Sequence, residues 1–132
     1  MTDPEAIRKR VLAHLAEQRA LVETLLSLKE QIQGSVFARY QECRKEGCVC
    51  SQGQKHGPYY ILSKRSGGKG SYAYLGEDDV PTVRDLVARS KAFRDGMKRL
   101  QKVNAELVAL LKAYQAASAQ QGVRRLGLPL QP

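Results

Sequence analysis

The sequence has little of what several classes of protein require. It contains no Trp, two Phe and three Cys among its 132 residues, and its longest apolar run is the short stretch 107–111. A membrane-spanning helix needs about 18 consecutive apolar residues, so no membrane segment is expected. Three cysteines cannot all pair with one another, and the first residues lack the regions of a signal peptide, which argues against a secreted disulfide-bonded protein. These absences predict one cytoplasmic domain, residues 1–132.

Acidic residues are scarce in the middle of the chain. The sequence has 22 Lys and Arg against 13 Asp and Glu, a net charge of +9. Residues 1–33 carry five side chains of each sign, whereas residues 34–76 carry seven basic and two acidic ones. This distribution favours an anionic partner, nucleic acid before a membrane surface. We therefore expect binding to involve the middle segment.

Two segments have the apolar spacing of long helices. Asp3 before Pro4 is typical of a helix start, and apolar or seam positions then recur at steps of four and three until Gly34. The same spacing recurs from Val83 to Tyr114. The pattern predicts helices over 3–33 and 80–121, a tail over 122–132, and an antiparallel coiled-coil hairpin. Four residues widen the apolar face of the first helix and predict a homodimer: Leu12, Leu15, Val22 and Leu26.

The segment 34–76 changes to the period of strands. Alternating β-branched and aromatic residues predict strands at 35–41, 59–63 and 71–75, and the glycines of 66–70 predict a hairpin turn. Such a sheet has too little apolar surface to be stable alone, so we expect an additional link, here called the staple, that holds the strands together. The predicted fold is α+β, mainly α, with two long helices flanking a zinc-stapled three-stranded antiparallel module.

The staple is predicted from the clustering of soft metal ligands. Four residues follow the spacing C-x4-C-x-C-x5-H: Cys43, Cys48, Cys50 and His56. Three thiolates and an imidazole complete a closed tetrahedral Zn²⁺ site, which makes the metal structural. Two alternatives remain open, namely three reduced cysteines in a turn and a redox-sensing thiol pair.

The same segment resembles a known family. The pattern includes Val36, Arg39-Tyr40, the three cysteines, His56-Gly57-Pro58-Tyr59 and Tyr74-Leu75. It resembles a family of small bacterial and archaeal proteins whose domain is of unknown function, over about residues 34–80. Because that family has no assigned activity, the resemblance implies a shared module and no particular function.

Basic and aromatic residues alternate on the predicted strands. This basic and aromatic group comprises Arg39, Tyr40, Tyr59, Tyr60, Lys64, Arg65, Lys69, Tyr72 and Tyr74. The candidates for nucleic-acid contact among them are Arg39, Tyr59, Lys64, Arg65, Lys69 and Tyr72. Basic side chains can bind phosphates while tyrosines stack on bases. The order of strands, turn and helix is also weakly similar to the arm-binding domains of phage-type tyrosine recombinases. The alternative is that the tyrosines pack the sheet on the helices and the lysines keep an edge strand soluble.

A second group of basic residues follows helical spacing in the last segment. Lys91, Arg94, Lys98 and Lys102 form a stripe that predicts further phosphate contacts. A solvated helix face is the alternative explanation.

No catalytic site is predicted. Residues 67–71 depart from the phosphate-loop pattern, the acidic residues 77–79 are explained by a helix start, and His14 has no nucleophile or paired carboxylate near it in sequence. The predicted function is therefore a non-catalytic accessory or regulatory protein that binds nucleic acid, DNA before RNA. The alternative is a coiled-coil adaptor for a protein partner with an acidic surface.

Overall fold

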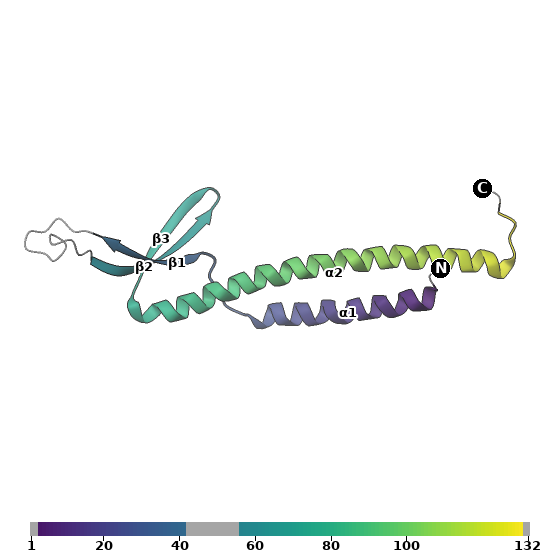
Figure 1. Cartoon of the computed structure of the whole chain (residues 1–132), viewed down its shortest axis with the longest axis horizontal. Coiled ribbons are helices and arrows are strands. Elements are labelled where there is room, and N and C mark those ends of the chain that lie inside the picture. The colour runs from purple at the N-terminus through teal and green to yellow at the C-terminus, as the bar shows by residue number, and fades with distance from the viewer. Residues whose placement is uncertain (1–2, 42–55, 131–132) are drawn as a thin grey trace, which may run out of the picture. The chain divides into compact units, whose positions relative to one another are not determined.

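The computed structural model describes residues 3–41 and 56–130. Along the chain lie helix α1 (Pro4–Ser27), strands β1 (Ser35–Gln41), β2 (His56–Ser66) and β3 (Lys69–Leu75), the short 3-10 helix η2 (Glu77–Asp79) and helix α2 (Val80–Leu126) (Figure 1). Two compact units result. One is Leu28–Phe93, and the other combines Met1–Ser27 with Arg94–Pro132. Helix α2 contributes residues to both.

The helices end at residues with left-handed backbone conformation. After α1, Lys29 has a φ of 57°, and the Ser27 hydroxyl donates to the carbonyl of Thr24 at 2.6 Å. Helix α1 therefore ends six residues before the predicted residue 33. At the other end of the chain, Gly127 has a φ of 61°, and the amide of Leu128 donates to the carbonyl of Val123 at 3.2 Å. This bond is typical of a glycine-capped helix end, so α2 extends into the predicted tail.

The sheet is antiparallel with the order β1-β2-β3. β1 pairs with β2 from Ser35↔Ser63 to Gln41↔His56, and β2 pairs with β3 from Tyr60↔Leu75 to Ser66↔Lys69. The two-residue turn between β2 and β3 is Gly67-Gly68, with φ values of 58° and 80°. Two central residues with positive φ are what a tight hairpin turn requires. The predicted three-stranded antiparallel sheet and its hairpin turn therefore agree with the structure.

The unit Leu28–Phe93 is held together by the start of α2. The amide of Ile32 donates to the carbonyl of Leu86 at 3.1 Å, and the Arg84 guanidinium lies 5.8 Å from the centre of the Tyr60 ring. Ile61 of β2 is 2 % exposed and is the largest fully buried side chain of the sheet. The segment after α1, the sheet and the first turns of α2 thus form one packed body.

The other unit packs α1 against the later part of α2. Its core consists of Ile7, Leu25, Val103 and Leu110. Pairs between the two segments run in opposite directions: Gln18 bonds to Asn104 and His14 to Glu106, with donor–acceptor distances of 2.8 and 2.9 Å. The segments are therefore antiparallel within this unit.

The predicted fold class, a coiled-coil hairpin that flanks a zinc-stapled sheet, is wrong. Helix α1 has 24 residues and α2 has 47, and the sheet shares its unit with the start of α2 and not with α1. Among residues 3–41 and 56–130, no group of three or more His, Cys, Asp or Glu is placed to hold a metal. The apolar spacing misled the helix prediction because Leu28 and Ile32 continue it, whereas Ile32 bonds to Leu86 in the sheet unit.

None of the helices that the structure describes has the length and apolar content needed to cross a membrane.

Candidate nucleic-acid interface

The sheet brings together most of the predicted nucleic-acid-binding residues. Side chains alternate between the two faces along a strand, and residues paired across strands share a face. The register pairs Arg39 with Tyr59, Ser63 with Tyr72, and Arg65 with Gly70. Because residues 59, 63 and 65 of β2 lie at even spacing, four of the six predicted sheet residues share one face: Arg39, Tyr59, Arg65 and Tyr72.

The two predicted lysines of the sheet lie on its opposite face. Lys64 pairs with Ser71, and Lys69 pairs with Ser66, so both alternate away from Arg65. Both lysines are exposed beside the hairpin turn. The structure therefore divides the predicted cluster into an aromatic and arginine face and a pair of lysines behind it.

Two further residues complete the first face and were not among the predicted site residues. Phe37 of β1 and Tyr74 of β3 flank Ile61 in one cross-strand row. We define the aromatic face as Phe37, Tyr59, Tyr72 and Tyr74. A signal was available in the sequence, since Phe37 lies two residues from Arg39 and Tyr74 lies two residues from Tyr72, the spacing that puts side chains on one face of a strand.

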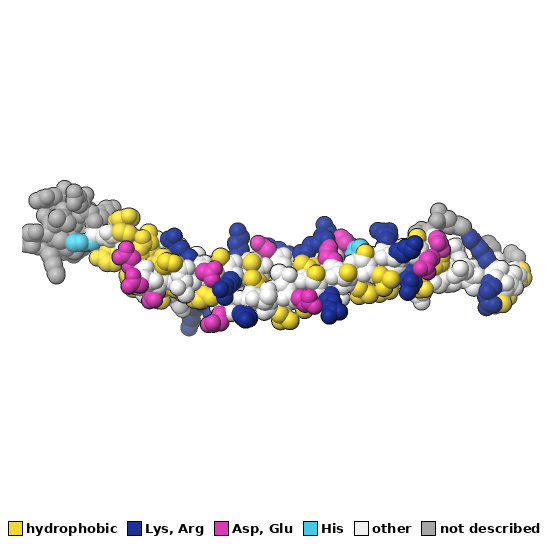
Figure 2. All heavy atoms as spheres, turned by 90° about the horizontal axis from the view of Figure 1, so that it is seen from below, with side chains coloured by type: hydrophobic (Ala, Val, Ile, Leu, Met, Phe, Trp, Pro, Cys, Tyr) yellow, Lys and Arg dark blue, Asp and Glu magenta, His cyan; other side chains and the backbone are white. Residues whose placement is uncertain are grey.

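The side chains of the aromatic face are open to solvent although they surround a buried residue. Phe37 and Tyr59 are 39 % and 41 % exposed, and Tyr72 and Tyr74 are 69 % and 66 % exposed. In the space-filling view, hydrophobic side chains, a class that includes tyrosine, gather in a yellow patch over the unit that contains the sheet (Figure 2). Exposed rings around a buried Ile61 form a surface that can accept a flat apolar group.

Of the four predicted zinc ligands, only His56 belongs to the described residues. It begins β2, opposite Gln41, and is partly exposed. Cys43, Cys48 and Cys50 lie outside the described residues, so the zinc site stays a prediction from the sequence.

The predicted basic stripe lies on α2. All four residues are exposed. Lys91 belongs to the unit Leu28–Phe93, whereas Arg94, Lys98 and Lys102 belong to the other unit, where their spacing follows the turns of the helix. Two neighbouring arginines of α2 bind carboxylates. Arg99 donates to both carboxylate oxygens of Glu17, and Arg89 forms an ion pair with Asp85 at 2.9 Å. Helix α2 thus carries arginines that bind carboxylates beside lysines that face solvent.

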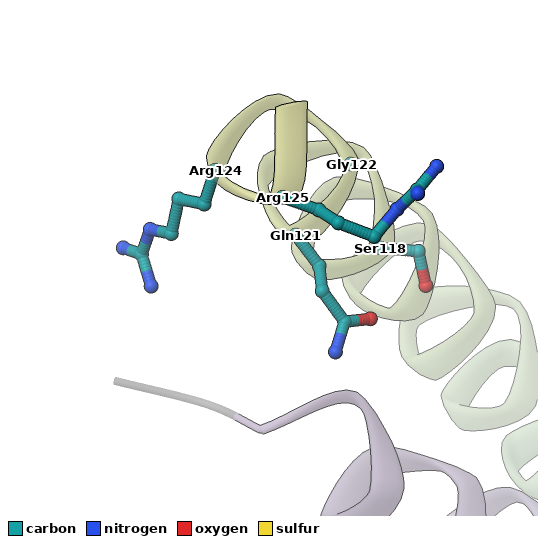
Figure 3. A pocket seen from close by; sticks show the side chains of 5 residues that line it. All are labelled: Ser118, Gln121, Gly122, Arg124 and Arg125. Atoms are coloured by element: carbon teal, nitrogen blue, oxygen red, sulfur yellow. The ribbon is translucent and has the colours of Figure 1, made fainter. Parts of the chain in front are cut away.

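The end of α2 carries a surface pocket lined by Ser118, Gln121, Gly122, Arg124 and Arg125 (Figure 3). Figure 3 shows Arg124 and Arg125 pointing away from each other. Two arginines that diverge cannot clamp one anion between them. The pocket therefore does not form a charged site comparable to the sheet.

A histidine–carboxylate pair joins α1 to α2 in their shared unit. His14 Nε2 lies 2.9 Å from a carboxylate oxygen of Glu106, and Nδ1 lies 2.9 Å from the carbonyl of Arg10. Both partners can only accept hydrogen bonds, so both ring nitrogens must donate. The geometry therefore favours the protonated imidazolium.

The pKa values of the pair move in the directions that this geometry requires. The hydrogen bond to the Arg10 carbonyl and then the bond to Glu106 raise the pKa of His14, while the bond from His14 lowers the pKa of Glu106. The side chain of His14 is 22 % exposed. The adjoining pocket is lined by Arg10, His14, Glu106, Ala109 and Leu110, none of which is a hydroxyl or thiol nucleophile.

This pair predicts a loss of stability as the pH rises. Because the folded state raises the pKa of His14, its contribution is fully present below the unfolded value of about 6.5 and disappears as the pH passes through the folded value. Glu106 contributes in the opposite sense, with stability that is lost as the pH falls through its lowered pKa. Thermal unfolding followed by helix circular dichroism should therefore show a lower midpoint above neutral pH than in mild acid.

The variant His14→Gln should flatten this dependence on pH. Gln18→Ala is the matched control, because it removes the neighbouring hydrogen bond to Asn104, in which neither side chain titrates. An equally steep dependence in His14→Gln and the parent would contradict the assignment of the effect to the His14–Glu106 pair.

Comparison with known proteins supports the predicted relationship to an uncharacterised family. A family described as "Domain of unknown function (DUF6788)" matches residues 12–85. No curated protein and no solved structure matches the chain. The matched segment runs from within α1 through the whole sheet to the first turns of α2 and covers more than half of the 132 residues. The chain belongs to the DUF6788 family of domains of unknown function.

Proposed function

We propose that this protein binds nucleic acid, DNA before RNA, through the three-stranded sheet and without catalysing a reaction. The observation that carries the proposal is the charge of the strands. β1, β2 and β3 contain four exposed basic residues and no Asp or Glu: Arg39, Lys64, Arg65 and Lys69. A strand surface with one sign of charge attracts phosphates and has no carboxylate to repel them.

The basic residues near the hairpin turn are suited to phosphate contacts. Lys64, Arg65 and Lys69 lie within three residues of Gly67-Gly68, on both faces of the β2–β3 hairpin. The guanidinium of Arg65 can bind a phosphate with two parallel hydrogen bonds, and lysine acts as a point charge. Such contacts position a nucleic acid without reading its sequence.

The stripe on α2 offers a second set of phosphate contacts. Lys98 and Lys102 are exposed. Lys102 lies one helical turn from Glu106, and the negative charge of Glu106 partly offsets the positive charge of Lys102. Each contact would contribute by the same salt-dependent mechanism as those of the sheet. We propose this stripe as a supplementary surface.

The salt dependence of DNA binding tests the proposed function. Replacing Lys64, Arg65 and Lys69 by Glu should weaken binding to a random-sequence duplex and reduce the slope of log affinity against log salt by about 0.9 for each phosphate that the variant no longer binds. Reversal of Lys98 and Lys102 should weaken binding further. Fluorescence anisotropy over a series of salt concentrations measures both quantities.

Charge reversal of Lys9 and Lys112 is the matched control, since both are exposed helical lysines outside the proposed surfaces. This double variant changes the net charge by as much as the reversal of Lys98 and Lys102 does, and it should bind nearly as the parent does. A parent that binds neither duplex nor single-stranded DNA at low salt would contradict the proposal and favour an acidic protein partner for the basic surface.

The unit of α1 and the later part of α2 supports a further part of the proposal, a homodimer. Leu12, Leu15, Val22 and Leu26 share one side of α1 and are 48 %, 41 %, 38 % and 71 % exposed. A two-helix pair leaves such a face uncovered, and a second copy would cover it in a four-helix arrangement. A dimeric binding protein would also present two sheets to one nucleic acid.

Light scattering at micromolar concentration tests this association. The parent should have the mass of a dimer, and Leu15→Gln combined with Leu26→Gln should shift it to a monomer because polar amides at the interface lose their hydration without gaining partners. Leu126→Gln is the control, since Leu126 is 60 % exposed at the end of α2 and lies outside this face. A monomeric parent would refute the dimer.

A further inference from the structure

The aromatic face contains more aromatic residues than a surface that only attracts phosphates requires. Lysines alone would make the strands soluble and attract phosphates, yet the register places four aromatic rings around Ile61. Tyr72 and Tyr74 belong to β3, an edge strand, and are the most exposed of the four. Two large rings on an exposed edge are a liability for a protein that does not bury them against a partner.

The position of Tyr72 leaves its ring available for stacking. Its neighbour on the same strand face is Gly70, and a Cβ added to Gly70 would lie 3.5–3.7 Å from the Oη, Cε2 and Cζ atoms of Tyr72. The ring therefore passes over a residue without a side chain and contacts the strand there. It is nevertheless 69 % exposed, so much of the ring faces solvent.

Basic groups border the aromatic face at both ends. Arg39 shares the row of Tyr59, next to the start of β2, and Arg65 shares the row of Gly70 at the hairpin end. Both are exposed, and no strand residue is acidic. Rings in the middle of a surface with cations at its ends can bind a chain of aromatic bases joined by phosphates.

A duplex is a poorer match to this surface than a single strand. The bases of a duplex are stacked on one another and offer only their edges, whereas an unpaired strand can turn each base onto an aromatic side chain. A sheet face of exposed rings supplies stacking partners and few groups that could read the edges of paired bases.

We propose that the aromatic face binds single-stranded nucleic acid, with bases stacked on Tyr72 and Tyr74 and phosphates bound by Arg39 and Arg65. This inference rests on the proposed nucleic-acid-binding function and names its substrate class. Stacking tolerates any base, so the preference is for unpaired strands and not for a sequence.

Binding of an oligothymidylate and of a random-sequence duplex to the full-length protein tests the proposal. The parent should bind the oligothymidylate more tightly. Tyr72→Ala and Tyr74→Ala should each weaken that binding by about tenfold, the usual effect of removing one stacked base, with little change in duplex affinity. The salt slope should stay unchanged because no phosphate contact is removed.

Two variants serve as controls for the removal of a ring. Tyr40 is 57 % exposed and lies between Arg39 and Gln41, where the register with β2 shifts, so it lies outside the aligned rows of the aromatic face. Tyr40→Ala should bind the oligothymidylate as the parent does. Tyr72→Phe keeps the ring and should retain most of the affinity, whereas an effect equal to that of Tyr72→Ala would point to the hydroxyl and overturn the stacking mode.

A spectroscopic test remains available if an alanine variant fails to fold. The chain contains no Trp, so Tyr72→Trp introduces a single indole into the aromatic face. Oligothymidylate should quench the fluorescence of this indole as a base stacks on it, and the duplex should quench it much less. An unquenched indole at saturating oligothymidylate would overturn the proposal.

The outcomes distinguish this inference from the proposed function. If the parent binds both probes equally and the tyrosine variants bind as the parent does, the aromatic face is not the site and the salt-dependent function stands. If the parent binds neither probe at low salt, both proposals fail. If Tyr72→Ala and Tyr74→Ala change the oligomeric state and leave binding unaltered, the face contacts a second copy of the chain.

Discussion

The cross-strand register of the sheet is the constraint on which the candidate site depends. A shift of either outer strand by one residue would turn its side chains to the other face. The observed register aligns Phe37, Ile61 and Tyr74 in one row and places Arg39 and Tyr59 in the next. The burial of Ile61 specifies this arrangement, because a one-residue slip of β2 would turn Ile61 to the opposite face of the sheet.

Polar side-chain pairs, and not a buried apolar residue, fix the register of the helical unit. Polar pairs join α1 to α2 where the apolar spacing is interrupted, as between Gln18 and Asn104. A polar residue at a seam position costs some stability but penalises alternative alignments, in which its partner would be missing. The helical unit therefore has a defined alignment although, of its described residues 3–27 and 94–130, only Ile7, Leu25, Val103 and Leu110 are buried.

Local patterns in the sequence predicted the sheet. The features that the sequence did not predict depend on contacts between residues far apart in the chain. Alternation and the Gly67-Gly68 turn are readable within a few residues, so all three strands were predicted. The end of α1 was not predicted correctly, because the apolar spacing of the sequence does not reveal that Ile32 bonds to Leu86. The partner of His14 lies 92 residues away, and no local pattern identifies Glu106 as that partner. The division of Lys64 from Arg65 could have been inferred from their adjacent positions on a strand.

The most direct test of the central claim is to map where a single strand touches the sheet. Photo-crosslinking of a bromodeoxyuridine-substituted oligonucleotide to the full-length protein, followed by peptide mass spectrometry, reports which rings lie against bases. We expect crosslinks at Tyr72 and Tyr74, and none at Tyr40 or at Tyr114 of α2. Crosslinks confined to Tyr40, or to α2, would contradict the assignment of the aromatic face as the binding surface.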